Sequence, residues 1–178
     1  MILSLQLYTA PSNHQLMVGI TEEDNIVWID WYTGEKEQFE QINKHLKPSE
    51  YIFQETVIFN QLKKELDGYF NGTLKEFQVP IQLVGTHFQK RVWKALLAIP
   101  YGETVTYSEQ SIKLGDLKAI RAVAKANGSN PISIIIPCHR VIGKNGSLTG
   151  YRGGISNKQF LLNHEALFSN KPVQGSLF

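Results

Sequence analysis

The stretch Asn130–Val141, which reads Asn-Pro-Ile-Ser-Ile-Ile-Ile-Pro-Cys-His-Arg-Val, constrains this chain more than any other and holds its only cysteine. The apolar run predicts a short buried strand or extended segment, and Pro137 ends it because proline cannot donate to a sheet ladder. Cys138 is then expected where the ordered backbone turns, a common place for a reactive side chain on a rigid support. The alternative interpretation is a small buried hydrophobic residue.

A thiol reacts as the thiolate, which needs a nearby positive charge, a helix N-terminus or a base. His139 follows Cys138 directly and is therefore a candidate base. A single cysteine forms no disulfide within the chain, and neither Cys-x-x-Cys nor His-Glu-x-x-His is present, so we expect no metal. The chain has no secretory signal and no run of about eighteen apolar residues, which favours a cytoplasmic protein without a membrane span.

Positive charge is concentrated in the second half of the chain. Residues 1–85 contain 6 Lys and Arg against 12 Asp and Glu, a balance of −6, whereas residues 86–165 contain 11 against 4, a balance of +7. The basic half is therefore the expected contact surface for a polyanion. Ordinary solvated lysines are the alternative explanation.

The pattern of apolar residues in residues 1–80 predicts an α/β support domain. Apolar residues alternate or cluster in residues 2–8, 15–20 and 25–31, which predicts three antiparallel strands in a meander. In residues 57–70 the apolar spacing changes to that of a helix.

Residues 81–169 predict a mostly helical domain. Thr86 is expected to cap its first helix. The pattern Thr106-x-x-Glu109 is a capping box that opens a second helix, and Gly115-Asp116 connects that helix to a third over residues 117–127. Two short helices joined by a tight glycine turn in the basic half predict a helix-turn-helix.

The third of these helices has a small face, with Arg121 projecting between residues that carry little or no side chain, namely Ala119, Ala122, Ala126 and Gly128. Such a face permits close approach to a nucleic-acid backbone, and it would equally permit close helix packing. Further on, Ser156 with Gln159 predicts a capping pair at the start of the last helix. Residues 170–178 are predicted to form a flexible tail.

Pro137–Val141 resembles the signature of the O(6)-alkylguanine-DNA alkyltransferases, repair proteins that move an alkyl group from a damaged base onto their own cysteine. The resemblance extends from Leu62 to Leu167 and is strongest from Gly85 onward. Its other segments, in chain order, are Gly85–Gln89, Val92-Trp93, Ile99–Tyr107, Arg121–Val123, Asn130-Pro131, Gly150–Gly154 and Leu161–Glu165.

The resemblance implies an RNase-H-like fold for the first domain and a winged-helix-like helix-turn-helix for the second. It implies that the chain acts as a monomer, without cofactor or metal, in the minor groove of double-stranded DNA that carries alkylated bases. There Cys138 would accept one alkyl group irreversibly from O(6)-alkylguanine or O(4)-alkylthymine in a base rotated out of the duplex.

The resemblance also implies roles for individual side chains. His139 matches the base, Glu165 matches the carboxylate that orients it, and Asn130 matches the side chain that ties the neighbouring turns together. Tyr107 matches the residue that crowds the target phosphate and donates a proton to the departing base. Arg121 matches the finger that fills the vacated space. The alternatives are a half-buried helix tyrosine and a phosphate-binding arginine.

Around the expected base slot, the resemblance places the residues of one loop together with two residues that flank the Cys-His-Arg triplet: Tyr151, Arg152, Gly153 and Gly154, with Pro137 and Val141. Glycines leave room for a flat base. Arg152 stands where several relatives carry a small residue, so it is expected to grip phosphate or to narrow the slot.

Three other functions fit parts of this pattern. A non-catalytic lesion-binding relative would replace Cys138, and a transcriptional regulator that uses only its helix-turn-helix would not need Glu165. A cysteine hydrolase would not need the flanking motifs.

The end of the chain, Gln174–Phe178, resembles the Gln-x-x-Leu-Phe peptide by which bacterial proteins dock onto the sliding clamp. The matching positions are Gln174, Leu177 and Phe178. Clamp docking is therefore a hypothesis, and an ordinary apolar C-terminus is the alternative.

Overall fold

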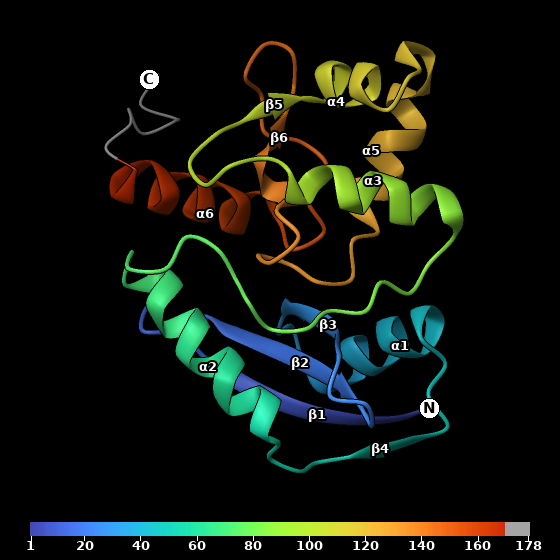
Figure 1. Ribbon diagram of the computed structural model, residues 1–178, viewed down its shortest axis with the longest axis vertical. Helices are drawn as coiled ribbons and strands as arrows, with labels where there is room; N and C mark the ends of the chain where they lie inside the picture. Colours follow the sequence, from blue (N-terminus) through green and yellow to red (C-terminus); the bar gives the residue numbers. More distant parts are fainter. Residues whose placement is uncertain (170–178) are drawn as a thin grey trace. The chain divides into compact units, whose positions relative to one another are not determined.

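The computed structural model describes residues 1–169, which fall into two compact units (Figure 1). The first unit contains Met1–Gly85 together with Pro131–Ser133, and the second contains Thr86–Asn130 and the chain from Ile134 onward. Each unit has a fully buried tryptophan, Trp28 in the first and Trp93 in the second. Among the described residues, no helix has both the length and the apolar character that a membrane crossing requires.

The first unit is built on a four-stranded sheet with the strand order β3-β2-β1-β4. β1 (Ile2–Thr9), β2 (Gln15–Thr21) and β3 (Ile26–Trp31) form the antiparallel meander that the sequence predicts. β4 (Glu50–Ile52) is absent from the prediction and pairs parallel to β1. A strand this short cannot show the alternation by which a strand is recognised in a sequence.

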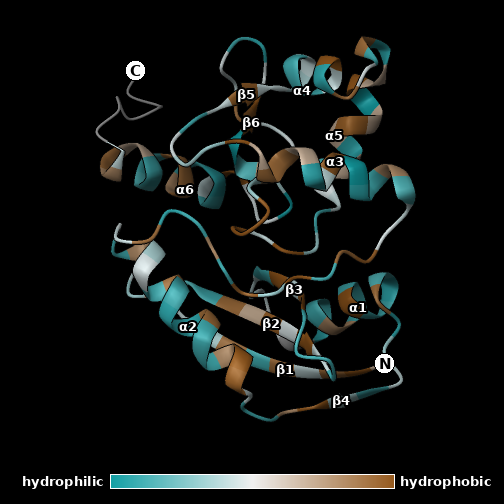
Figure 2. Cartoon of the chain, viewed as in Figure 1, coloured by the Kyte–Doolittle hydropathy of each residue, from teal (hydrophilic) through white to brown (hydrophobic). Residues whose placement is uncertain are grey.

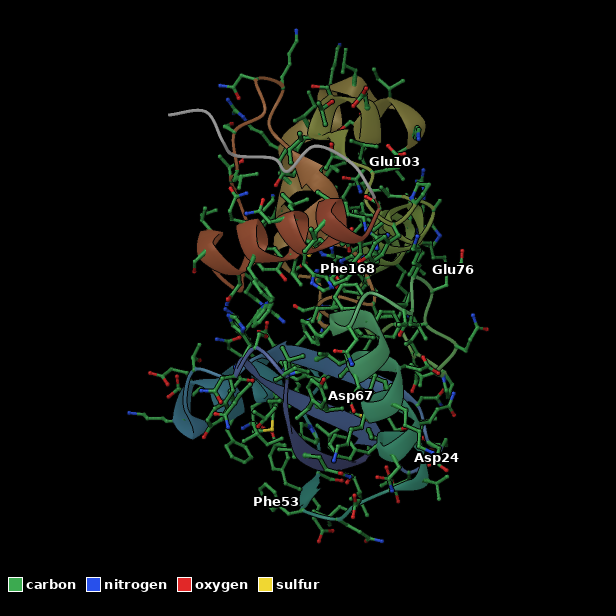
Figure 3. All side chains as sticks on the ribbon, turned by 90° about the vertical axis from the view of Figure 1, so that its left-hand side faces the viewer. Asp24, Phe53, Asp67, Glu76, Glu103 and Phe168 are labelled. Atoms are coloured by element: carbon green, nitrogen blue, oxygen red, sulfur yellow. The ribbon has the colours of Figure 1, made fainter. Side chains whose placement is uncertain are left out.

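The predicted helix over residues 57–70 is confirmed as α2 (Val57–Phe70). It begins at Thr56, whose side chain accepts a hydrogen bond from the first turn. Tyr8 on β1 donates from its hydroxyl to Asp67 Oδ1 on α2 at 2.8 Å, which ties the helix to the sheet (Asp67 is labelled in Figure 3).

A second helix of this unit, α1 (Glu35–His45), is absent from the prediction. Its N-cap is Gly34, which provides no side-chain cap, and polar residues outnumber apolar ones along it (Figure 2). Ile42 of α1 packs with Leu3 and Leu5 of β1, which alternate with the strand residues that face α2. Because neighbouring strand residues point to opposite faces, the two helices cover opposite faces of the sheet.

The residues just before the isoleucine run belong to the first unit. Ile29 N donates to Pro131 O at 2.9 Å, and Ser133 N donates to Ile29 O at 2.7 Å, so Pro131–Ser133 pairs with β3. The next residue, Ile134, has a φ of +73°, a left-handed conformation that a β-branched residue rarely adopts. The predicted extended segment is therefore paired at its start and sharply bent at Ile134.

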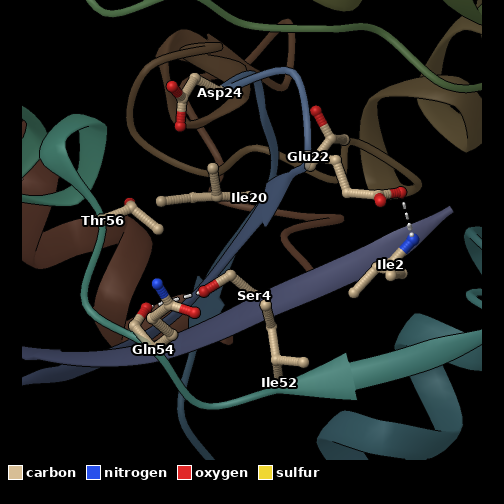
Figure 4. Close-up of a pocket in the computed structure, with 9 residues that line it drawn as sticks. Ile2, Ser4, Ile20, Glu22, Asp24, Ile52, Gln54 and Thr56 are labelled. Atoms are coloured by element: carbon tan, nitrogen blue, oxygen red, sulfur yellow. Dashed lines mark hydrogen bonds between the residues drawn. The ribbon is translucent and has the colours of Figure 1, made fainter.

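The first unit also contains a hollow of about 110 Å³, lined by residues of β1, β2, the turn after β2, the end of β4 and the segment that joins β4 to α2 (Figure 4). Ser4 Oγ donates to Gln54 O at 2.8 Å, and Glu22 accepts from Ile2 N at 3.0 Å. None of the candidate catalytic or binding residues named from the sequence lines this hollow.

The second unit is mostly helical, as predicted. α3 (His87–Leu97) begins at Thr86 and α4 (Tyr107–Lys113) begins at Thr106, and each start is a complete capping box. Both predicted helix starts are confirmed. They could be predicted because a capping box depends on only a few neighbouring residues.

The turn after α4 follows the prediction, and the next helix departs from it. Gly115 has a φ of +93°, and Asp116 accepts a hydrogen bond from the next turn through its side chain. The chain then forms a 3-10 turn, η1 (Leu117–Ala119), before α5 (Ile120–Gly128). The predicted helix is therefore α-helical only from Ile120.

A short parallel pair of strands brings two distant segments together. β5 (Val105–Thr106) pairs with β6 (Val141–Ile142) in this unit. Tyr107 follows β5, and the Cys-His-Arg triplet precedes β6. The start of α4 is thereby placed beside the segment that contains Cys138.

The last helix, α6 (Ile155–Phe168), starts one residue before the predicted position. The predicted capping pair of Ser156 and Gln159 is wrong, because Gly154 is the N-cap and makes no side-chain cap hydrogen bond. Gln159 donates instead to Asn163 Oδ1 at 2.8 Å along the helix.

Candidate active site

Cys138 lies at a tight turn, as the sequence predicts. Pro137 has φ −82° and ψ 61°, the shape of the central residue of an inverse γ-turn, and Cys138 N donates to Ile136 O at 2.8 Å. A 3-10 turn, η2 (Cys138–Arg140), follows and leads into β6. Because the proline ring holds φ near this value, Pro137 shapes the turn at Cys138. The prediction that Pro137 ends an extended segment is wrong, because the chain already turns at residues 133–135.

Asn130 contacts this turn and the sulfur together. Its Nδ2 donates to Ile136 O at 2.8 Å and to Cys138 Sγ at 3.2 Å. Both residues are buried, with Asn130 2% and Cys138 7% exposed. A donor aimed at the sulfur favours the thiolate, since a hydrogen bond to the charged form stabilises that form.

The carboxylate of Glu165 is the centre of the polar network. Its Oε1 accepts from His139 Nε2 at 2.8 Å and from Arg140 Nη2 at 3.0 Å. Its Oε2 accepts from Arg140 Nε at 2.9 Å and from Gly102 N at 3.0 Å. Burial alone would raise the pKa of Glu165, but His139 and Arg140 outweigh it and hold the pKa well below its usual range. Glu165 is thus a buried anion surrounded by donors.

His139 is held as a neutral base. Burial lowers the pKa of His139, although Glu165 opposes this effect. Because a carboxylate can only accept, the hydrogen is assigned to Nε2, which leaves Nδ1 unprotonated. Nδ1 is buried and has no hydrogen-bond partner among the described residues. It is therefore the nitrogen able to receive a proton.

Arg140 is a site residue to which the sequence assigned no role. Its guanidinium binds both oxygens of Glu165, donates through Nη1 to Ile99 O, and lies 5.7 Å from the centre of the Tyr101 ring. A bidentate arginine keeps a carboxylate ionised and fixes its orientation. Its place beside Cys138 and His139 was visible in the sequence, but its burial was not.

Lys158 on α6 is a second residue that the sequence analysis missed. It is fully buried, and its Nζ donates to Val141 O at 2.6 Å and to Thr149 O at 2.9 Å. No carboxylate within residues 1–169 forms an ion pair with Lys158. Burial lowers the pKa of Lys158 to about 8, and its interaction with Cys138 opposes that shift. A buried ammonium favours a nearby anion, and the sulfur of Cys138 would provide one when it is ionised.

Tyr107 lies against the loop that precedes α6. Its hydroxyl donates to Thr149 O at 3.0 Å, and Lys158 Nζ is 5.8 Å from its ring centre. Burial, with a smaller contribution from Cys138, raises the pKa of Tyr107, so the phenol stays protonated. Gly150 has a φ of +68°, and a Cβ there would lie 3.0 Å from the Tyr107 hydroxyl, so this close approach favours glycine.

The residues expected around a base slot differ in exposure. Pro137, Val141 and Tyr151 are buried, and Arg152 is half-buried. Gly153 is half-buried and Gly154 exposed.

The small face expected on α5 is only partly exposed. Arg121 and Ala122 are exposed, and Gly128 is half-buried. Ala126 is 3% exposed, and its carbonyl accepts from Trp93 Nε1 of α3 at 2.8 Å. The predicted DNA contact at Ala126 is therefore corrected, because this side of α5 packs against α3. Residues 1–169 contain no group of three or more His, Cys, Asp or Glu side chains placed to hold a metal ion.

Both parts of the chain match known protein families. A family described as "6-O-methylguanine DNA methyltransferase, ribonuclease-like domain" matches residues 18–83, and "6-O-methylguanine DNA methyltransferase, DNA binding domain" matches residues 87–167. A methylated-DNA–protein-cysteine methyltransferase of Methanosarcina acetivorans is 43% identical over 159 residues, which cover 89% of this chain and 96% of that protein.

Two solved structures from Mycobacterium tuberculosis are similar over nearly the whole chain. The O6-methylguanine methyltransferase has a TM-score of 0.77 and 39% identity, covering 96% of this chain and 95% of that one. The protein OGT in complex with DNA has a TM-score of 0.75 and 38% identity, covering 98% of this chain and 97% of that one.

The buried network predicts that acid lowers the free energy of unfolding. The pKa of His139 is 6.5 in its ordinary state and lower in the fold, so below that pH the unfolded chain binds a proton that the folded chain does not. The pKa of Glu165 is also lowered in the fold, so the free energy of unfolding decreases further at pH values below the ordinary pKa of 4.5. Urea unfolding between about pH 5 and 8 should show a smaller slope of stability with pH in His139→Asn than in the exposed control His87→Asn. Equal slopes in the two variants would contradict a contribution of His139 to the pH dependence of stability.

Lys158 is predicted to stabilise the thiolate of Cys138. Because the chain has one cysteine, iodoacetamide labelling reports on that sulfur alone. In Lys158→Met, labelling at neutral pH should be slower by about tenfold, which corresponds to about one unit in the thiol pKa. The pH of half-maximal labelling should rise, an effect that simple loss of folded protein does not produce. Lys144→Met changes an exposed lysine and is the control. Equal labelling rates in the two variants would contradict a role of Lys158 in stabilising the thiolate.

Proposed function

This chain belongs to the 6-O-methylguanine DNA methyltransferase family, and from that premise we propose that Cys138 is the residue that receives the methyl group. As a family member, the chain is a methylated-DNA–protein-cysteine methyltransferase that binds and repairs DNA. The observation that carries the residue assignment is the contact between the single cysteine and Asn130, directly beside the buried His139–Glu165 pair.

The reaction begins when the proton leaves Cys138. His139 Nδ1 takes it, through one water because neighbouring side chains in a chain rarely face each other. Glu165 stabilises the resulting imidazolium, as a carboxylate does in a hydrolase triad. Asn130 and Lys158 stabilise the thiolate that remains.

The thiolate sulfur then attacks the methyl carbon. A carbon–sulfur bond forms as the bond from carbon to guanine O(6) breaks, and its electron pair stays with the base. Tyr107, which is kept protonated, donates a proton to the departing base. The products are unmodified guanine and a thioether, which water does not displace, so each chain reacts once.

The damaged base must leave the stack to reach this sulfur. Cys138 is 7% exposed, and rotating a base out of the duplex costs roughly a few kcal/mol. The exposed Arg121 fills the vacated space, and Ala122 and Gly128 allow α5 to approach the backbone in the minor groove. Tyr107 exchanges its hydrogen bond to Thr149 O for one to the base.

The same chemistry extends to O(4)-alkylthymine, because that lesion also carries its alkyl group on an oxygen of the pairing edge. The partly buried side chain of Arg152 favours small adducts over bulky ones. No step requires a second copy of the chain, so the monomer is the reacting species.

The predicted sliding-clamp peptide, with Gln174, Leu177 and Phe178 as its matching positions, lies outside the described residues. Clamp docking would bring the protein to replicating DNA. We expect the full chain to be retained on immobilised bacterial clamp and a chain lacking residues 174–178 to pass through. Equal retention would remove the hypothesis.

The transfer is tested by weighing the intact protein after incubation with a duplex that contains O(6)-methylguanine. The expected result is a permanent gain of one methyl group per chain, and none in Cys138→Ser although that variant still binds DNA. Binding without a gain in mass would favour a non-catalytic lesion-binding protein. A methyl group gained by Cys138→Ser would refute the assignment of the acceptor.

A further inference from the structure

A buried pair of amides joins the two helices of the helix-turn-helix (α4 and α5 in Figure 1). Gln110 on α4 and Asn127 on α5 are each 2% exposed. Asn127 Nδ2 donates to Gln110 Oε1 at 2.7 Å, and Gln110 Nε2 donates to Asn127 Oδ1 at 3.2 Å. Neither side chain takes part in the network around Glu165.

Such a pair determines geometry more than stability. Replacing two buried hydrogen-bonded partners by apolar side chains of similar shape is often nearly neutral for folding. Apolar side chains can pack in several registers, whereas Gln110 and Asn127 are both satisfied in one. A buried polar contact can therefore specify how two helices meet.

The amide pair holds α5 at its C-terminal end. There, Ala126 O accepts from Trp93 Nε1 at 2.8 Å and from Ser129 Oγ at 2.9 Å. The other end of the helix emerges from a 3-10 turn, and no side chain caps it. The amide pair thus fixes one end of α5, and the exposed N-terminal part of the same helix carries Arg121.

The held end of α5 leads directly to the nucleophile. Asn130 N donates to Asn127 O at 3.1 Å, and Asn130 Nδ2 donates to Cys138 Sγ at 3.2 Å. One continuous set of contacts therefore runs from Gln110 through Asn127 and Asn130 to the sulfur.

We propose that Gln110 and Asn127 are positioning residues, whose amide pair fixes the DNA-facing end of α5 relative to Cys138. This inference rests on the transfer reaction proposed above. Without the pair, α5 still presents Arg121 to DNA, but the rotated base arrives displaced from the sulfur. A displacement of about 1 Å can lower a rate by about a hundredfold.

Two double variants test the proposal. Gln110→Leu with Asn127→Leu makes both partners apolar and leaves no amide unpaired. Gln110→Asn with Asn127→Gln exchanges the two side-chain lengths and keeps both amides. For each protein we would measure thermal stability, duplex affinity, the single-turnover rate of methyl transfer from duplex, and iodoacetamide labelling of Cys138 without DNA.

The apolar variant should fold, and its duplex affinity and its labelling rate should each lie within about threefold of the parent values. Its rate of methyl transfer should nevertheless be lower by at least about tenfold. The exchanged variant should recover most of the transfer rate. Transfer at the parent rate in the apolar variant would overturn the proposal. So would an equal loss of labelling and transfer, which would indicate a damaged site rather than a displaced base. A parent protein that gains no methyl group would instead overturn the proposed function.

Discussion

The buried carboxylate of Glu165 is the interaction on which the site depends. An unpaired anion in this place would be strongly destabilising, so its donors must all be present in the fold. They come from His139 and Arg140 on the 3-10 turn η2, and from the backbone of Gly102 on the turn after α3. Gly102 has a φ of +72°, and a Cβ there would lie 2.7 Å from Ser169 Cβ, so this close approach to the end of α6 favours glycine. One charge thus sets the relative positions of the turn after α3, the turn at Cys138 and α6.

The elements that could be predicted from the sequence are those with local causes. The capping boxes at Thr86 and Thr106, the meander of the first unit and the turn at Pro137 each depend on a few neighbouring residues. The missed elements lack such a cause. α1 has no side-chain cap, β4 is too short to alternate, and α6 starts at a glycine rather than at Ser156. The burial of Ala126 depends on where α3 lies, which its own helix does not reveal.

The chemistry of the site was predictable in part, for a similar reason. The family resemblance singled out Cys138 and Glu165, but Arg140 acquires its partner only through folding. Lys158 did have a signal, because it shares one helical face with Leu161, Leu162 and Glu165, and all four are buried. A lysine on a buried face that also carries leucines is an exception to the usual pattern, and this exception is the signal. In the proposed mechanism, Glu165 orients the base and Lys158 favours the ionised nucleophile.

The protonation state of His139 at neutral pH tests this arrangement most directly. In protein labelled with ¹⁵N at histidine, the His139 signals can be identified by their absence from the spectrum of His139→Asn. The expected spectrum is that of a neutral imidazole with its hydrogen on Nε2, facing Glu165, and a bare Nδ1. A hydrogen on Nδ1, or on both nitrogens, would leave His139 unable to accept the proton of Cys138 and would contradict the mechanism.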